Sequence, residues 1–225
     1  WSLAVLRDGR LAAGCDYGRI RLVEVGAEAG AVVAMMKGHT SVVAALAVLP
    51  DGTLASGAWD DTVRVWDVDA LENVRTMIPV DHTGPVNALA VLTDGQLASG
   101  SDDQTVLRWD VATNSRKRVL EALEGHTRKV YALAALPNGW LAIGSDNKSI
   151  RLLDPRRPRA AHRRARDCDS WSIAVETDGE DDSESDDEER LKGHTGSVRA
   201  LASLPGGRLA SGSSDKTVRL WRLPP

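Results

Sequence analysis

Short apolar stretches recur along the chain, and each is bounded by turn residues. VVAALAVL at 42–49 and VNALAVL at 86–92 are both followed by an Asp-Gly pair. TVRVWDV at 62–68 alternates apolar and polar positions, which is the period of a half-buried strand. The turn WDD at 59–61 separates it from TLASGA at 53–58. This pattern predicts an inner strand, a second strand and a third strand, joined by tight turns.

A weaker apolar segment follows the third strand. The segments are AVVAMM (31–36), RTMIPV (75–80) and KRVLEAL (117–123), and each predicts an outer fourth strand. A single four-stranded sheet cannot bury both of its faces, so units of this kind must stack on one another.

The unit is repeated. PDGTLASGAWDDTVRVWDV (50–68), TDGQLASGSDDQTVLRWDV (93–111), PNGWLAIGSDNKSIRLLD (137–154) and PGGRLASGSSDKTVRLWRL (205–223) align, and RDGRLAAGCDYGRIRLVEV (7–25) is a weaker fifth copy. Successive copies are offset by 43, 43, 44 and 68 residues. The last step therefore holds roughly 25 extra residues relative to the blade period of about 43.

A His-Thr turn precedes four copies, as KGHT (37–40), VDHT (80–83), EGHT (124–127) and KGHT (192–195). The His and the Trp-position residue are 27 apart in every case: His39 and Trp66, His82 and Trp109, His126 and Leu153, His194 and Trp221.

These GH and WD signals, with SGSxDxTVRLWD between them, resemble the WD-repeat family, whose fold is the β-propeller, commonly with seven blades. The resemblance implies an all-β chain forming a β-propeller of four-stranded antiparallel blades. We expect one domain (1–225) with five blades at about 1–36, 42–80, 86–123, 130–177 and 198–223. The first copy has no GH turn, and Pro224-Pro225 directly follow the last third strand, so an incomplete or poorly closed ring is expected.

The resemblance also implies a buried hydrogen-bond network of Trp, Ser, His and Asp in each regular blade. Trp donates only, a hydroxyl does both, and a carboxylate only accepts, so such a chain satisfies itself. By position the networks are His39, Ser56, Asp60 and Trp66; His82, Ser99, Asp103 and Trp109; His194, Ser211, Asp215 and Trp221.

Ser, His and Asp together also suggest hydrolase triads, but an enzyme needs one such site in a cleft, not the same trio in every repeat.

Two copies depart from the pattern of the network residues. The fourth has His126, Ile143, Asn147 and Leu153, and the first has Ala13, Tyr17 and Val23, so these two blades are expected to be the least regular.

In the family, partners usually bind the face made by the GH turns and the tight turns. The corresponding contact positions flank the inner-strand Val or precede the tight-turn Asp. Trp59, Tyr131 and Arg199 stand out among them because Trp, Tyr and Arg dominate binding hot spots; for Trp59, packing on a neighbouring blade is an equal alternative. The positions are Asp16, Ser41, Val43, Trp59, Pro85, Asn87, Asp102, Lys129, Tyr131, Asp146, Ser197, Arg199 and Ser214.

Residues 155–190 form a charged insert, basic in PRRPRAAHRRARD and acidic in ETDGEDDSESDDEER. This composition predicts disorder, with SWSIAV (170–175) as a possible substitute outer strand. Ser183 and Ser185 each have an acidic residue three places on, which suits phosphorylation by an acidophilic kinase of the casein kinase II type.

Composition narrows the function. The formal net charge is −4 and the body outside the insert is near neutral, which argues against a nucleic-acid binder. Two cysteines, Cys15 and Cys168, favour a reducing intracellular compartment, cytoplasmic or nuclear. No apolar stretch is long enough to span a membrane, and no metal or cofactor motif is present.

We therefore expect a non-catalytic scaffold that binds proteins or peptides, as a monomeric subunit of a larger complex. The alternatives are a substrate-recognition subunit of a ubiquitin ligase, a subunit of an RNA-processing complex and, least favoured, a propeller enzyme.

Overall fold

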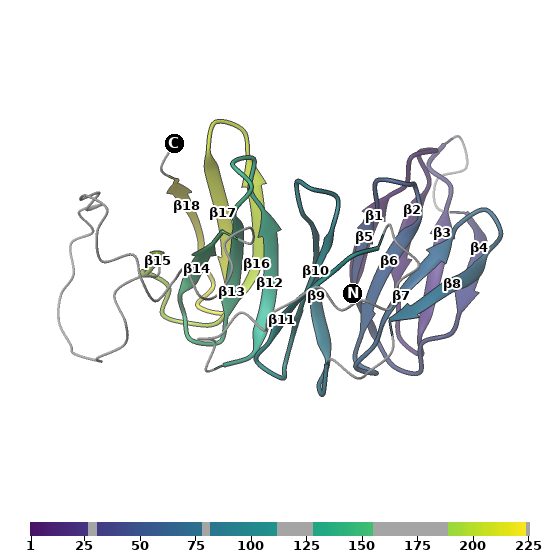
Figure 1. Cartoon of the computed structure of the whole chain (residues 1–225), viewed down its shortest axis with the longest axis horizontal. Coiled ribbons are helices and arrows are strands. Elements are labelled where there is room, and N and C mark those ends of the chain that lie inside the picture. Colours follow the sequence, from purple (N-terminus) through teal and green to yellow (C-terminus); the bar gives the residue numbers. More distant parts are fainter. Residues whose placement is uncertain (27–30, 78–81, 112–127, 155–188, 224–225) are drawn as a thin grey trace.

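The computed structural model describes residues 1–26, 31–77, 82–111, 128–154 and 189–223. Within these ranges the chain forms five antiparallel sheets and no helix. In Figure 1 the first two sheets lie at the right, the third in the middle and the last two at the left. The all-β prediction is confirmed.

Each sheet is built from consecutive strands. The first holds β1 (Ser2–Val5), β2 (Leu11–Gly14), β3 (Arg19–Val23) and β4 (Val32–Lys37). The second holds β5 (Val43–Val48), β6 (Leu54–Ala58), β7 (Val63–Asp67) and β8 (Glu72–Met77). The third holds β9 (Val86–Val91), β10 (Leu97–Ser101) and β11 (Val106–Trp109).

The fourth sheet holds β12 (Val130–Ala135), β13 (Leu141–Ser145), β14 (Ile150–Leu153) and β15 (Glu189–Leu191). The fifth holds β16 (Val198–Leu204), β17 (Arg208–Ser213) and β18 (Val218–Arg222). We call each sheet a blade and number the blades one to five.

The outer strand of blade four is β15, which takes Glu189 and Arg190 from the end of the expected insert and pairs them with Leu152 and Arg151. The sequence did not indicate 189–191 as this outer strand. The segment expected there, 170–175, lies outside the described residues, as does the expected outer strand at 117–123 of blade three.

The blades bury their apolar faces against each other. Four core clusters are found in the described residues, and each joins two neighbouring blades. In the first cluster, Ile20 and Leu22 of blade one pack with Leu54 and Trp66 of blade two. The sheets therefore stack as the sequence predicted, because the apolar face of one blade packs against the next blade.

A glycine in the second strand and a valine at the start of the next inner strand recur at every blade junction. A Cβ on Gly57 would lie 2.6 Å from Val86 Cγ1, and one on Gly100 would lie 2.5 Å from Val130 Cγ1. Gly14 with Val43 and Gly144 with Val198 repeat the contact. The glycine therefore lets the valine of the following blade approach its sheet closely.

The two ends of the row leave apolar side chains uncovered. On blade one, Leu3 and Val5 are 71% and 68% exposed, and on blade five Val218 and Leu220 are 76% and 66% exposed. Val63 and Val65 of blade two, which correspond to Val218 and Leu220, are only 1% and 3% exposed because blade three covers them. The blades thus form an arc that does not close into a ring, as expected.

Candidate functional site

Each regular blade carries a chain of buried hydrogen bonds that begins at its tryptophan. In blade two, Trp66 Nε1–H donates to Ser56 Oγ at 2.7 Å, and Ser56 Oγ lies 2.7 Å from His39 Nε2. His39 Nδ1 lies 2.9 Å from Asp60 Oδ2. This set links two strands, β6 and β7, with the two turns that hold His39 and Asp60.

Blades three and five repeat this geometry. Ser99 Oγ lies 2.8 Å from Trp109 Nε1 and 2.7 Å from His82 Nε2, and His82 Nδ1 lies 2.9 Å from Asp103. In blade five the contacts of Ser211 with Trp221 and His194 are both 2.7 Å, and His194 Nδ1 lies 2.8 Å from Asp215.

The order of donors follows from the chemistry of the groups. The carboxylate accepts only, so His39 Nδ1 carries the proton; Ser56 Oγ already accepts from Trp66, so its own hydrogen points to His39 Nε2. Every member of the chain is then satisfied when the imidazole is neutral.

A threonine completes each network, although the sequence reasoning did not include it. Thr62 Oγ1 donates to Asp60 Oδ1 at 2.7 Å, and Thr105 and Thr217 donate to Asp103 and Asp215 at 2.6 Å. Its signal was present, since Thr stands two residues after the turn Asp in all three copies.

Hydrogen bonds keep these carboxylates ionised. Burial opposes ionisation of Asp60, but donation from His39, Thr62 and the Thr40 backbone N–H outweighs it and holds the pKa of Asp60 well below its usual value. The pKa of Asp103 is lowered by the same balance. For Asp215, the bond from Thr217 is the largest cause of a lowered pKa.

The Ser–His–Asp geometry resembles that of a hydrolase, but the serines are placed for structure. Ser56 and Ser99 are 0% exposed and Ser211 is 1% exposed, and each hydroxyl also accepts the Trp N–H. A substrate carbonyl has no path to these oxygens, so the networks act as braces between strands and turns.

The irregular copies replace the network with apolar packing. Ile143 is buried in the core between blades three and four, and Leu153 packs against it. Asn147 accepts from Ser149 Oγ at 2.9 Å, as the turn Asp of each regular blade accepts from its Thr. In blade one Tyr17 is 82% exposed, and His126 lies outside the described residues.

A β-bulge marks the start of four inner strands. Ladder pairing skips one residue in each, namely Ala44, Asn87, Tyr131 and Arg199. A bulged residue is left out of the ladder and its side chain is re-aimed. These variable residues therefore lie where the inner strands meet the turns. We call the surface made by these turns the GH rim. Its turns are 38–42, 59–61, 82–85, 102–104, 128–129, 146–148, 193–197 and 214–216.

The structure brings the expected contact residues of the GH rim together in pairs that cross from blade to blade. Trp59, 42% exposed, lies with its ring centroid 5.5 Å from that of Trp1. Arg199 of blade five places its guanidinium carbon 3.7 Å from the ring centre of Tyr131 on blade four. Both pairs combine exposure with packing.

Polar pairs join the same rim. Asp102 of blade three accepts from Lys129 Nζ of blade four at 2.6 Å and from Asn87 Nδ2 at 2.8 Å. Ser197 of blade five donates its hydroxyl to Asp146 of blade four. The rim is thus a set of side chains that hold one another in place.

Two details of the sequence reasoning need correction. Val43, taken as a contact position, is 0% exposed, because it is the valine that packs on Gly14; the bulged residue of blade two is Ala44. Trp1 was not among the expected rim residues. It lies 13 residues before Gly14, the second-strand glycine of its blade. The same spacing separates each bulged residue from the glycine of its own blade: Ala44 and Gly57, Asn87 and Gly100, Tyr131 and Gly144, Arg199 and Gly212.

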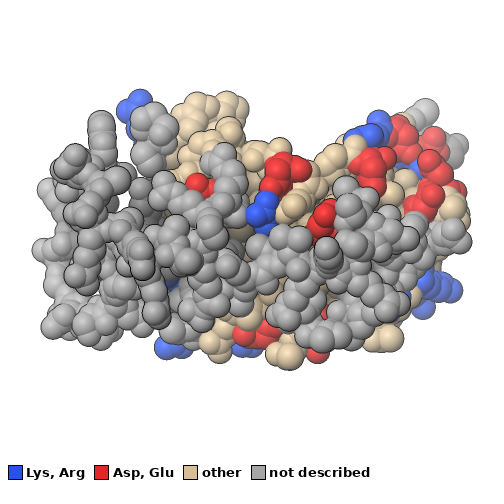
Figure 2. Space-filling model, viewed as in Figure 1, with Lys and Arg blue, Asp and Glu red and all other residues tan. Residues whose placement is uncertain are grey.

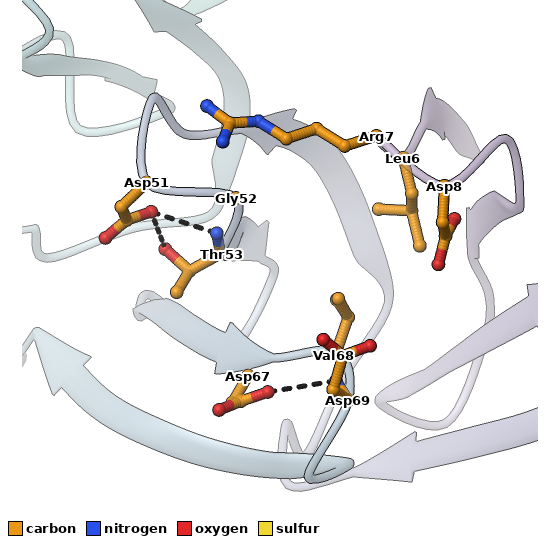
Figure 3. Close-up of a pocket in the computed structure, with 9 residues that line it drawn as sticks. All are labelled: Leu6, Arg7, Asp8, Asp51, Gly52, Thr53, Asp67, Val68 and Asp69. Atoms are coloured by element: carbon orange, nitrogen blue, oxygen red, sulfur yellow. Dashed lines mark hydrogen bonds between the residues drawn. The ribbon is translucent and has the colours of Figure 1, made fainter.

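A hollow of about 340 Å³ lies between blades one and two, at the turns that join first and second strands. Figure 3 shows Asp8, Asp51 and Asp67 around it, and Figure 2 shows acidic side chains gathered over these two blades. The carboxylates serve the turns: Asp51 accepts from Thr53, Asp67 from the Asp69 N–H, and Asp8 from Arg10.

Within the described ranges, no three His, Cys, Asp or Glu side chains are arranged to hold a metal ion. The same part of the chain contains no helix long and apolar enough to cross a membrane. Ser183 and Ser185, the predicted phosphorylation sites, lie outside the described residues.

Stacked antiparallel blades with one buried network per regular repeat define the β-propeller class. The family model "WD domain, G-beta repeat" matches residues 30–67, 73–110, 117–154 and 187–222, which is more than half of the chain. The chain therefore belongs to the WD40 repeat family, whose members generally act as protein-interaction scaffolds.

Solved structures with the same fold span a longer chain. "Structure of U3-55K" shares 26% identity at a TM-score of 0.74, and "Crystal structure of RRP9 WD40 repeats" shares 25% at 0.76; each match covers 98% of this chain but only 60% and 59% of the other. "Crystal structure of WD40 beta propeller domain of Doa1", at 22% identity and a TM-score of 0.72, covers 97% of this chain and 62% of its own. No curated protein sequence matches the chain.

The family repeats are offset from the blades. Residues 30–67 take in β4, which belongs to blade one, and β5 to β7, which belong to blade two. Residues 187–222 likewise take in β15 of blade four and β16 to β18 of blade five. Each such repeat therefore ties two neighbouring blades together covalently.

Proposed function

We propose that the chain is a non-catalytic scaffold that binds partner proteins or peptides on the GH rim. The observation that carries this proposal is the contrast between the blades' repeated framework and their variable rim. The networks repeat the same residues at fixed spacing, whereas the five positions at the inner-strand starts hold Trp, Ala, Asn, Tyr and Arg. Varied side chains at one repeated place on a constant framework suit a grafted binding site.

The packing of the rim supports the same conclusion. Trp59 and Arg199 are exposed, but each lies against an aromatic ring of another blade. Side chains held in place before binding lose less entropy when a partner arrives. Large aromatic and Arg side chains fixed in this way are suited to act as anchors.

Catalysis finds less support. The Ser–His–Asp trios that the structure describes are closed to substrates, and the acidic side chains of the hollow between blades one and two are engaged in turns. We infer an intracellular, monomeric subunit of a larger complex; the narrower assignments to a ubiquitin ligase or an RNA-processing complex stay predictions.

The test is affinity capture from cells that express the protein, followed by identification of the co-purifying proteins. A Trp59→Ala/Arg199→Ala double variant is compared with Arg208→Ala/Arg222→Ala, which removes two exposed arginines from the opposite rim. Both variants must give the β-sheet circular dichroism spectrum of the unmodified protein.

We expect the first variant to lose the partners and the second to keep them. Retention of every partner by the folded Trp59→Ala/Arg199→Ala variant would contradict binding on the GH rim.

A further inference from the structure

The guanidinium of Arg199 is positioned like a binding group rather than like a structural one. It makes no hydrogen bond or ion pair with the residues that the structure describes, and it lies 3.7 Å from the ring centre of Tyr131. Stacking on an aromatic ring occupies the flat face of a guanidinium and leaves the N–H donors at its edge available. The residue is exposed, so those donors face solvent.

The surroundings of Arg199 favour an anion. Blades four and five carry exposed cations in the turns of the GH rim at Arg128, Lys129, Lys148 and Lys216. Within the described residues only Lys129 among these four has a carboxylate partner, Asp102. The nearby acids are engaged, since Asp146 accepts from Ser197 and Asp215 is held by His194 and Thr217.

We propose that Arg199, stacked on Tyr131, binds a single anionic group, a carboxylate or a phosphate, on a partner peptide. The planar fork of Arg matches either group with two parallel hydrogen bonds. This inference rests on the proposed function and narrows it: the partner presents an acidic or phosphorylated side chain to blades four and five.

An extended polyanion such as RNA fits this surface less well. The rest of the rim carries carboxylates at Asp61 and Asp102, which would repel a continuous phosphate backbone. Burial, and to a lesser extent the charges of Asp60 and Asp103, raise the pKa of Asp61. A local anion on a peptide avoids that repulsion.

The test uses the 225-residue chain and three immobilised pools of random peptides that share one central residue: Glu, phosphoserine or Gln. We expect the Glu pool, the phosphoserine pool or both to bind about tenfold more tightly than the Gln pool, the effect of one charge-assisted contact. The pool that binds distinguishes carboxylate from phosphate.

Two substitutions separate the stacked fork from charge alone. Arg199→Lys keeps the charge but lacks the planar fork, so it is expected to weaken binding of the preferred pool, whereas Arg222→Lys on the opposite rim changes nothing. Tyr131→Leu removes the stacking ring and is expected to weaken binding, and Tyr131→Phe restores it.

Equal binding of all three pools, failure of all three, or full binding by Arg199→Lys would overturn the proposal. Binding of single-stranded oligouridine at physiological salt that Arg199→Lys abolishes, without a preference among peptides, would overturn it in favour of RNA. If the three peptide pools show no anion preference but the Trp59→Ala/Arg199→Ala variant still loses its captured partners, this inference is wrong and the proposed function stands.

Discussion

At the residue scale, one serine hydroxyl holds each complete network together. Ser99 accepts from Trp109 and donates to His82, so a single oxygen satisfies two buried groups. The resemblance to the WD-repeat family implied these four-residue sets, and the constant spacing of the motifs assigned their residue numbers, because a constant offset along a repeat becomes a constant place in the sheet. One rim position was wrong because two adjacent valines open the inner strand of blade two. The expected position, Val43, was counted from Val42, whereas the bulged residue is Ala44.

Replacing Ser99 with Ala would leave the Trp109 N–H and His82 Nε2 without partners. We expect a loss of about 1–3 kcal/mol in the free energy of unfolding, measured by urea denaturation followed by tryptophan fluorescence. Ser203→Ala, at an exposed position, serves as the control. Equal stability of the two variants would count against the network as a source of stability.

The lowered pKa values of Asp60, Asp103 and Asp215 make the networks sensitive to acid. A carboxyl with a lower pKa in the folded state stabilises the fold above its unfolded pKa of about 4 and loses that contribution as the pH falls toward the folded value. Asp103→Asn should therefore lower the thermal midpoint most at neutral pH, with a gap from the unmodified protein that narrows below about pH 4.

The matched control is Asp69→Asn, at a side chain that is 88% exposed. It should change the midpoint little at any pH. A gap for Asp103→Asn that stays constant from neutral to acid pH would show that the carboxylate charge adds nothing.

At the scale of the strand, the contact between glycine and valine sets how closely the blades pack. Apolar periodicity predicted the inner, second and third strands well, because these strands supply most of the buried apolar side chains of the core clusters. The outer strands were less accurate: β8 begins at Glu72, before the expected 75–80. An outer strand lies at the edge of its sheet, so burial constrains its sequence less.

Gly57→Ala tests this junction, since the new Cβ would lie 2.6 Å from Val86 Cγ1. We expect a cost of about 1–3 kcal/mol from overpacking, measured by chemical denaturation. Gly212→Ala is the matched control, because the nearest atom to its Cβ is Ala200 Cβ at 3.6 Å. Combining Gly57→Ala with Val86→Ala should cost less than the sum of the two; additive costs would place the strain elsewhere.

At the scale of the whole molecule, the blades form an open arc in which stability comes from junctions between neighbours. Repeat proteins of this kind sum the stability of each unit and of each interface. The repeats and their WD signature predicted the fold class and the stacking of the blades. They did not predict how rim residues pair across blades, because that depends on contacts such as Tyr131 with Arg199, 68 residues apart.

Val65 and Leu220 occupy the same register, opposite Ala55 and Ala210, but Val65 is 3% exposed and Leu220 is 66% exposed. Val65→Ala should therefore cost about 2 kcal/mol, whereas Leu220→Ala should change the stability by less than about 0.5 kcal/mol. Thermal denaturation of the two variants measures the difference. Equal losses would show that Leu220 is covered in solution.

The central claim is that partners bind the GH rim. Hydrogen exchange of the chain, alone and in complex with a captured partner, tests it most directly, because the two rims lie on different peptides. In the complex we predict slower exchange than in the free chain at 58–62, 128–132 and 195–199. Exchange in the turns of the opposite rim, at 7–10, 50–53 and 93–96, should be unchanged. Protection of the opposite rim, with the GH rim unchanged, would contradict it.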